Sequence, residues 1–518
     1  MSSALAANGD AAAAAAALDD ARLLHSIGLM RQMGADVARM AQAADTALEV
    51  ANQLYRQRYV ATASVAYGMA LQGGERRLEP LLSYGLSLQH QGRAEEAIQV
   101  FRAAAELHPG PAIHQFLLFA HFYAKDGIER HAAEASRWAA LYTVQPPQPV
   151  FANPPSASRR LRLGYVAPSF AQSQLRQFVK PVMESHDREA FDIFLFPARA
   201  EGETGWTRPM GVHPIGGLDD ASAADLIRSR GIDVLVDCWG HTAGSRLGVF
   251  AHRPAPVQAA WLNYQQTTGL PAMDYALHAD CVEGPGMADA FVETPWRVGP
   301  TSAPFRPDEE SIATPAPALK NGYATFASFN NPAKLSDETV AAWARILKRQ
   351  PTSRLILKYR YFVDPILCAA TSSRFVTHGV DPSRIDFRGH TTGEAYAAEF
   401  GEVDLMLDPS PVPGGTTSLE ALSRGVPVLA LAGPTFYSRT GLQILTGAGL
   451  DDLIASDWDD YVARALALSA SAAGLQALRD RTRAGFAAAN YRDEVAVTRN
   501  LERVYRSMFE IWERRRFG

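Results

Sequence analysis

Residues 404–432 read DLMLDPSPVPGGTTSLEALSRGVPVLALA, and this stretch decides the fold. An apolar run at 404–408 ends in a glycine-rich turn, a helix-like segment follows, and a second apolar run stands at 426–432. A strand, a helix and a strand in this order form a parallel strand pair with a crossover helix. The stretch therefore predicts one βαβ unit of a doubly wound sheet.

The same alternation continues along the chain in two groups of apolar runs. LRLGYVA, DIFLF and DVLVD precede residue 300, and YATFASF, RLILK, RIDFRG, DLMLD and VPVLALA follow residue 320. Residues 300–320 are rich in Pro and Ser, which is typical of a linker. We therefore expect an α/β protein with two Rossmann-like domains, at residues 161–305 and 318–490, and a ligand cleft between them.

The chain before residue 161 predicts helices. Residues 1–20 are a low-complexity N-terminus, residues 21–145 read as helices, and residues 146–160 form a Pro-rich linker. LEPLLSYGLSLQHQGRAEEAIQVFRAAAELHPGP, at residues 78–111, has the helix-turn-helix pattern of a tetratricopeptide repeat. An ordinary helical bundle is the alternative. At the other end of the chain, residues 491–518 predict a helix that packs back on the core.

Composition excludes several classes of function. Lys and Arg total 50 against 55 Asp and Glu, which leaves a formal charge of −5 and no general nucleic-acid-binding surface. Three separated cysteines predict neither a disulfide framework nor a zinc site. The sequence shows neither a secretion signal nor an apolar run long enough for a membrane span. We therefore expect a cytoplasmic protein.

The first candidate motif is the turn and helix start inside the opening stretch. Gly414 and Gly415 allow an unusual backbone, and Thr416 and Thr417 open a helix whose free N–H groups can bind a phosphate. The alternative is a purely structural capping box, which would engage Glu420 within the first turn of the helix.

The second motif, FNNPAKLSDE, follows a strand of the same domain. Ser336 can cap the next helix, which leaves Lys334 near the carboxyl edge of the sheet. A lone lysine there is usually a solvated surface residue. Together with the glycine-rich turn, however, Lys334 forms a plausible diphosphate clamp.

The third motif is VDCWGHTAGSR, in which a strand ends at Asp237 and a turn carries His241. His241 can serve as an acid or base, or it can be a turn histidine bonded to backbone. GxSxG, HExxH and Walker A motifs are absent, and no GxGxxG follows the first strand. Hydrolase, zinc protease and dinucleotide-binding functions are therefore disfavoured.

These motifs, in this order, resemble the protein O-linked N-acetylglucosamine transferases, the plant Spindly-like proteins and the bacterial relatives of glycosyltransferase family 41. The resemblance covers about residues 80–515 and is most specific between Asp237 and Tyr275. It implies a GT-B fold with an N-terminal acceptor-side domain. It also implies a C-terminal domain that binds a nucleotide sugar, with no required metal or other cofactor.

The resemblance also assigns a donor site. Lys334 would contact the donor diphosphate and would be a catalytic residue, the amides of Thr416 and Thr417 would hold the distal phosphate, and Glu420 would contact the ribose. The complete implied donor site consists of Asn331, Lys334, Tyr396, Gly415, Thr416, Thr417 and Glu420.

The chain departs from the family pattern at several positions. Ser173 and Gln177 stand where the family has histidines, one of which has been proposed for catalysis. The usual YPGTxG reads YQQTTG at residues 264–269. Gly415 replaces the His of GHTT, and Tyr396 falls where a His that contacts the base is common. These changes affect the acceptor side and the sugar more than the nucleotide.

The resulting hypothesis is an inverting glycosyltransferase that moves a sugar, GlcNAc from UDP-GlcNAc by resemblance, to Ser or Thr hydroxyls of a protein guided by the helical repeats. Lys334 would stabilise the leaving phosphate, and the acceptor proton would leave through His241, Asp237 or a water chain. Two alternatives stay open. One is a catalytically degenerate scaffold or binding protein, and the other is a transferase with a different nucleotide sugar or a dedicated acceptor.

Overall fold

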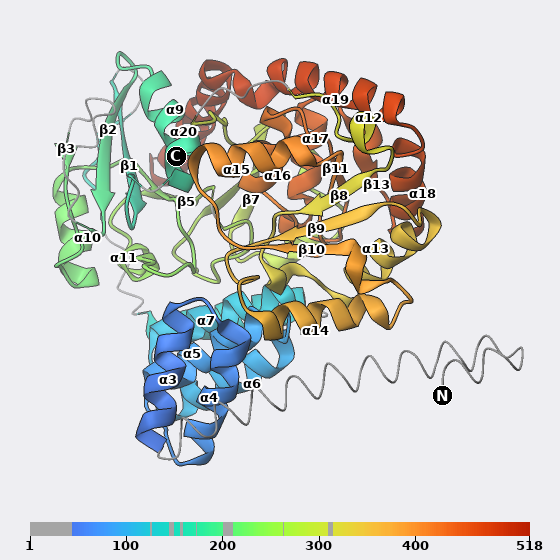
Figure 1. The fold of residues 1–518 in the computed structure, drawn as a ribbon. Helices are drawn as coiled ribbons and strands as arrows, with labels where there is room; N and C mark the ends of the chain where they lie inside the picture. The colour runs from blue at the N-terminus through green and yellow to red at the C-terminus, as the bar shows by residue number, and fades with distance from the viewer. Residues whose placement is uncertain are drawn as a thin grey trace, which may run out of the picture.

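The computed structural model describes residues 44–124, 127–143, 150–155, 159–171, 173–199, 211–262, 264–308 and 314–517. The expected low-complexity segment 1–20 lies outside these residues. Helices come first, as antiparallel neighbours: α3 (Ala44–Arg56), α4 (Val60–Gln72), α5 (Leu78–Gln89), α6 (Ala94–Leu107), α7 (Pro111–Tyr123) and α8 (Gly127–Tyr142). These helices, the helical part, lie beneath the rest of the molecule in Figure 1.

Small residues set the spacing of these helices. A Cβ atom added at Gly85 of α5 would lie only 2.3 Å from the ring of Phe101 in α6. Glycine at this position therefore lets the two helices cross closely. Gly92 makes the following turn with a left-handed φ of 78°.

The first sheet is parallel throughout, with strand order β3-β2-β1-β4-β5-β6-β7. Its strands are β1 (Leu161–Ala167), β2 (Phe191–Pro197), β3 (Gly211–Val212), β4 (Val234–Asp237), β5 (Val257–Ala260), β6 (Tyr275–Ala279) and β7 (Thr294–Gly299). Helices α9 (Ser173–Ser185), α10 (Asp220–Ser229) and α11 (Leu247–Ala251) are its crossovers. We call this unit the first half.

The second sheet is also parallel and repeats the same winding, in the order β10-β9-β8-β11-β12-β13. Its strands are β8 (Thr325–Ser328), β9 (Arg354–Lys358), β10 (Ile385–Arg388), β11 (Leu405–Leu407), β12 (Val428–Leu431) and β13 (Ile454–Ala455). Its helices are α12 (Ala318–Asn321), α13 (Asp337–Arg349), α14 (Pro365–Val376), α15 (Gly393–Glu399), α16 (Thr416–Ser423), α17 (Thr440–Gly447), α18 (Trp458–Leu468) and α19 (Ala472–Ala487). We call this unit the second half.

In each half, the first strand lies next to the fourth strand, so the winding reverses direction between them. This topological switch point falls between β1 and β4 in the first half and between β8 and β11 in the second half. Ligands of doubly wound sheets bind beyond the carboxyl ends of the strands at such points. Both switch points are therefore expected binding positions.

The three parts of the chain share their cores. Ala135 and Trp138 of α8 are buried in the core on one face of the first sheet, and Val60 and Ala61 of α4 belong to the core of the second half. The last helix, α20 (Glu494–Phe517), returns to the first half and packs on the other face of its sheet. The helical part is therefore docked on both halves.

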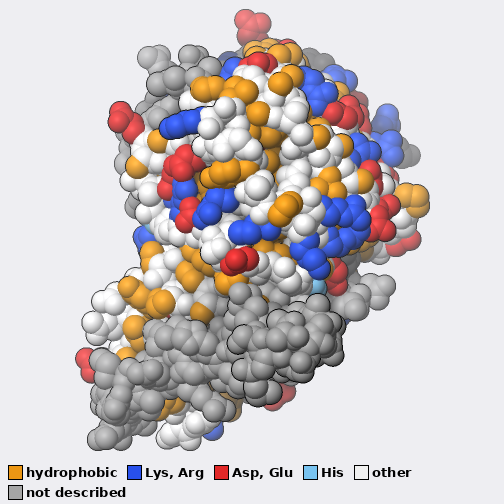
Figure 2. Space-filling view, turned by 45° about the vertical axis from the view of Figure 1, so that its right-hand side comes forward, with side chains coloured by type: hydrophobic (Ala, Val, Ile, Leu, Met, Phe, Trp, Pro, Cys, Tyr) orange, Lys and Arg blue, Asp and Glu red, His pale blue; other side chains and the backbone are white. Residues whose placement is uncertain are grey.

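Acidic and basic side chains lie interspersed over the face of the molecule that Figure 2 shows. Within the described ranges, no helix is both long enough and apolar enough to cross a membrane.

Candidate active site

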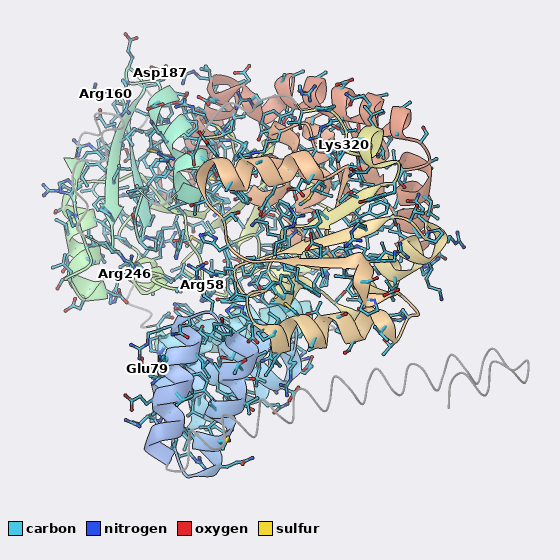
Figure 3. All side chains as sticks on the ribbon, in the orientation of Figure 1. Arg58, Glu79, Arg160, Asp187, Arg246 and Lys320 are labelled. Carbon is cyan, nitrogen blue, oxygen red and sulfur yellow. The ribbon has the colours of Figure 1, made fainter. Side chains whose placement is uncertain are left out.

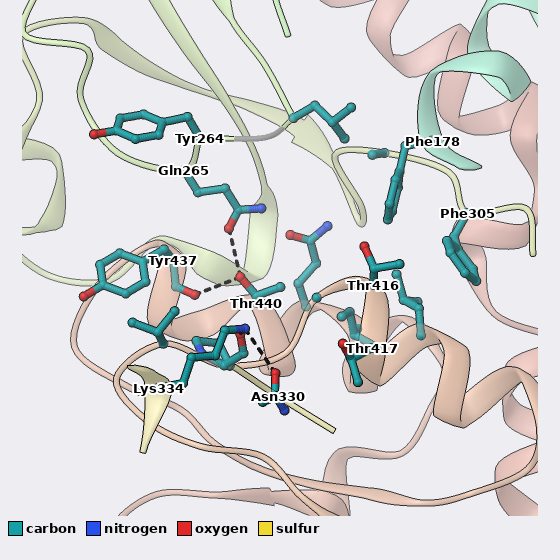
Figure 4. Close-up of a pocket in the computed structure, with 18 of the residues that line it drawn as sticks. Phe178, Tyr264, Gln265, Phe305, Asn330, Lys334, Thr416, Thr417, Tyr437 and Thr440 are labelled. Carbon is teal, nitrogen blue, oxygen red and sulfur yellow. Dashed lines mark hydrogen bonds between the residues drawn. The ribbon is translucent and has the colours of Figure 1, made fainter. Parts of the chain in front are cut away.

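A cavity of about 490 Å³ lies between the two halves (Figure 4). Helix α7 of the helical part closes one side of it. Its walls are the segments that follow β1, β5 and β7 of the first half and β8, β9, β11 and β12 of the second. The cavity thus lies beyond the carboxyl ends of both sheets and includes the switch point of the second half. This is the expected ligand site of two facing Rossmann-like units.

Lys334 reaches the cavity from the loop after β8. Its ammonium group donates hydrogen bonds to Asn330 Oδ1 at 3.1 Å and to the Pro413 carbonyl at 2.7 Å. Burial lowers the pKa of Lys334 to about 8, against the opposing charge of Asp408. Lys334 is therefore protonated at pH 7 and presents its charge to the cavity from a fixed position.

The glycine-rich turn and the start of α16 face the same space. Helix α16 begins at Thr416, and its N-cap residue, Gly415, provides no side-chain cap. The turn before it is held by Asp408, whose Oδ1 accepts a hydrogen bond from the Gly414 amide at 2.7 Å. The helix start thus leaves backbone N–H groups without side-chain acceptors, a favourable environment for an anion.

The capping-box alternative is wrong. Glu420 lies beyond the first turn of α16 and accepts a hydrogen bond from the Tyr396 hydroxyl at 2.8 Å. Burial raises the pKa of Glu420. Neither Tyr396 nor Glu420 belongs to the described lining of the cavity, whereas Lys334, Thr416 and Thr417 do. Asn331 and Gly415 line it as well.

Asp408 and Asn330 are site residues that the sequence motifs did not single out. They follow β11 and β8, the two strands on either side of the switch point. Burial raises the pKa of Asp408 to about 7, and its Oδ2 has no hydrogen-bond partner among the described residues. The position directly after a buried parallel strand is the signal that could have identified both residues.

His241 and Asp237 do not reach the cavity, so their expected role as proton acceptors needs correction. His241 is buried with its ring against Trp138 of α8, and its Nε2 lies 2.7 Å from the Thr268 carbonyl. Burial lowers the pKa of His241 to about 4. Asp237 is also buried and accepts the Gly240 amide at 2.7 Å. Both side chains hold turns, which is the structural alternative for His241.

One side of the cavity is formed largely by aromatic residues that no motif indicated. Phe119, Phe122 and Tyr123 of α7 line it together with Tyr437 of the second half. The Tyr437 hydroxyl donates to the Phe122 carbonyl at 3.1 Å, and their rings lie 4.7 Å apart. The helical part therefore forms one wall of the cavity.

The YQQTTG segment also contributes to this side. The Thr440 hydroxyl donates to Gln265 Oε1 at 3.1 Å, a hydrogen bond that joins the two halves across the cavity (Figure 4). Buried Glu293 accepts hydrogen bonds from Thr267 and Thr268 and holds the segment in place. The segment thus stays ordered without the Pro and Gly of the family pattern.

Helix α9 carries the two positions at which the family has histidines. Ser173 is its first residue, and Gln177 is buried and directed toward Asp308. Leu175 and Phe178 of the same helix line the cavity instead. Among the described residues, the part of α9 that lines the cavity is apolar and contributes no imidazole.

Two facing Rossmann-like units with a ligand cavity between them define the GT-B class of fold. The model of the family "Glycosyl transferase family 41" matches residues 109–294 and 315–493. The chain therefore belongs to glycosyl transferase family 41.

Individual relatives agree with this assignment. A tomato (Solanum lycopersicum) protein named "Probable UDP-N-acetylglucosamine--peptide N-acetylglucosaminyltransferase SPINDLY" is 32% identical over 412 residues, 76% of this chain. The match spans 43% of that relative's length. The SEC protein of Arabidopsis thaliana is 27% identical, over 68% of this chain and 37% of its own length.

A solved structure extends the likeness to the fold. A mutant of the Thermobaculum terrenum O-GlcNAc transferase is 28% identical and superposes with a TM-score of 0.83. The superposition covers 96% of this chain and 98% of that one. The fold thus matches that of a bacterial protein with the same arrangement of parts.

Proposed function

We propose that this protein is an inverting glycosyltransferase. It moves GlcNAc from the nucleotide sugar UDP-GlcNAc to Ser or Thr hydroxyls of a protein. One observation carries the proposal: the Lys334 ammonium group and the uncapped start of α16 face a single cavity. The names of the SPINDLY and SEC relatives support the same donor and a peptide acceptor.

The geometry suggests how the reaction proceeds. When the bond between the sugar and the diphosphate breaks, negative charge develops on the phosphate. Lys334 and the N–H groups of α16 stabilise that charge, so the proposed site requires no metal.

The described lining of the cavity contains no Asp, Glu or His that could act as a nucleophile or base. The acceptor oxygen therefore attacks the anomeric carbon directly, which inverts its configuration. Its proton passes to a phosphate oxygen of the donor or to water.

The same lack of a carboxylate or imidazole in the described lining supports a second candidate function. Gln177 stands on α9 at one of the positions where the family pattern has a histidine. A protein that binds the nucleotide and a partner without transferring the sugar would need Lys334 and α16 but no base. A different sugar or a dedicated acceptor is also compatible with the altered positions.

Calorimetric titration tests the donor site. We expect UDP to bind more tightly than GDP or dTDP, and Lys334→Ala to lose about 2 to 4 kcal/mol of that affinity, since it removes a charged partner of the phosphate. Lys348→Ala, on the exposed face of α13, is the matched control.

Mass spectrometry of an acceptor peptide incubated with UDP-GlcNAc then separates the glycosyltransferase from the non-catalytic binding protein. Binding without transfer would favour the non-catalytic function, and absence of nucleotide binding would contradict both.

A further inference from the structure

Two arginines and a histidine lie close together where the helical part meets the second half. Arg58 lies in the turn between α3 and α4, and Figure 3 shows it at this junction. Arg360 and His390 follow β9 and β10, and both are exposed. We call Arg58, Arg360 and His390 the cationic rim.

Aromatic rings connect the cationic rim to the cavity. The guanidinium group of Arg360 lies 5.5 Å from the ring of Tyr359 and 5.1 Å from that of Tyr361. Tyr359 itself lines the cavity. Tyr361 continues toward the helical part, where its hydroxyl lies 3.2 Å from His90 Nε2. Arg360 therefore lies next to the part of the cavity wall that Tyr359 forms.

The charge of the rim is not neutralised by the described part of the protein. Neither Arg58 nor Arg360 forms an ion pair with a described carboxylate, although Arg388, close by in β10, pairs with Asp386 and with Glu402.

The neighbouring carboxylate, Glu399, already forms an ion pair with Lys358 at 2.6 Å. Partial burial, followed by the charges of Arg58, Lys358 and Arg360, lowers the pKa of His390. Two uncompensated arginines thus remain on a chain whose formal charge is −5.

We propose that the cationic rim binds acidic residues of the acceptor polypeptide next to the hydroxyl that is modified. This inference rests on the proposed function, which places that hydroxyl in the cavity. Guanidinium groups form paired hydrogen bonds with carboxylates, and stacking on Tyr359 and Tyr361 holds Arg360 in an orientation suited to such a bond. Lys334 and α16 already provide the positive charge that the donor phosphates need, so the rim is available to the acceptor.

The test measures peptide binding without turnover, using the full chain saturated with UDP. Two fluorescent peptides share a central Ser, which is flanked by Asp and Glu in one and by Asn and Gln in the other. We expect the acidic peptide to bind about three- to tenfold more tightly at low salt, an advantage that salt reduces. The double variant Arg58→Gln/Arg360→Gln should lose this preference. Arg349→Gln, on the exposed end of α13, should retain it.

Each outcome decides the proposal. Equal binding of the two peptides by the unmodified protein, or a preference that survives in the double variant, overturns it. A double variant that loses UDP affinity but keeps the peptide preference assigns the rim to the donor, which also overturns it. If the unmodified protein does not bind UDP, the proposed function fails, and the two peptides then tested without UDP decide whether the rim binds acidic polypeptide.

Discussion

Each half of the molecule carries a buried aspartate at the switch point of its sheet, but only one of the two lies beside a residue that reaches the cavity. Asp237 is the last residue of β4 and Asp408 directly follows β11, each beside the switch point of its sheet. Each is buried, each accepts a glycine amide at 2.7 Å, and burial raises the pKa of each to about 7. Asp408, however, lies close enough to Lys334 for their charges to interact, and Lys334 reaches the cavity.

The two aspartates differ because the carboxyl edges of the two sheets are covered by different parts of the chain. Trp138 of α8 packs against His241, so the helical part covers the turn that follows β4. The edge beyond β8 and β11 faces the cavity. A switch point therefore becomes a binding site only where the rest of the fold leaves it open, and the next variants test this difference.

The largest effect is expected at Asp364, which fixes the helical part to the second half. Its buried carboxylate accepts the Ala61 amide at 2.7 Å, the Thr62 amide at 3.0 Å and the Thr62 hydroxyl at 3.0 Å. Asp364→Ala leaves these groups unpaired inside the interface, so we expect a loss of about 3 to 5 kcal/mol in the free energy of unfolding. Chemical denaturation followed by circular dichroism measures it.

Asp457→Ala is the control, because Asp457 caps only the exposed start of α18. Its loss should be about 1 kcal/mol. Equal losses for the two variants would show that the helical part is not held by Asp364.

The second prediction concerns His241. If it failed, the switch point of the first half would also have a role in catalysis. His241→Gln should lower the free energy of unfolding by about 1 to 3 kcal/mol, because a packed ring and a buried hydrogen bond are lost. Transfer, measured as kcat/KM, should stay within about threefold of the unmodified enzyme with the same pH profile. A loss of transfer of about a hundredfold at unchanged stability would instead give His241 a catalytic role.

Much of the fold can be predicted from the sequence because buried parallel strands are continuous apolar runs. LRLGYVA coincides with β1 and RLILK with β9. β3 and β13 have two residues each, too few for a recognisable pattern, and β7, at an edge of the sheet, buries only Val298. These strands form through pairing with neighbours, which the local sequence does not encode.

The side of the site that carries Lys334 could be predicted for a similar reason, and the aromatic side could not. Lys334 and Thr416 lie in the segments that follow β8 and β11 of one sheet, whose carboxyl ends meet at one edge. Phe122 and Tyr437 come together from α7 and from the segment after β12, 315 positions apart. Such contacts depend on how the helical part docks, and no local motif specifies that.

The third prediction uses pH to separate the two aspartates. UDP affinity should fall as pH rises from about 6 to 9, because Asp408 gains a negative charge near pH 7 and Lys334 loses its positive charge near pH 8. Asp408→Asn should remove the step near pH 7 and move the Lys334 step to lower pH, because the charge of Asp408 raises the pKa of Lys334. Asp237→Asn should leave both steps unchanged. Calorimetry across this range measures the profile, and a flat one would contradict the burial of Lys334.

The smallest effect is expected where the two halves touch across the cavity. Thr440→Val keeps the shape of the side chain and removes the hydroxyl that contacts Gln265 Oε1 and the Tyr437 carbonyl, a loss of about 0.5 to 1.5 kcal/mol. Because Gln265 belongs to the first half, the loss should raise the KM for the acceptor peptide and leave UDP affinity within about twofold. An equal loss of UDP affinity would mean that Gln265 and Thr440 act on the donor as well. Nucleotide binding would then not be confined to the second half, since residues of both halves would contribute to it.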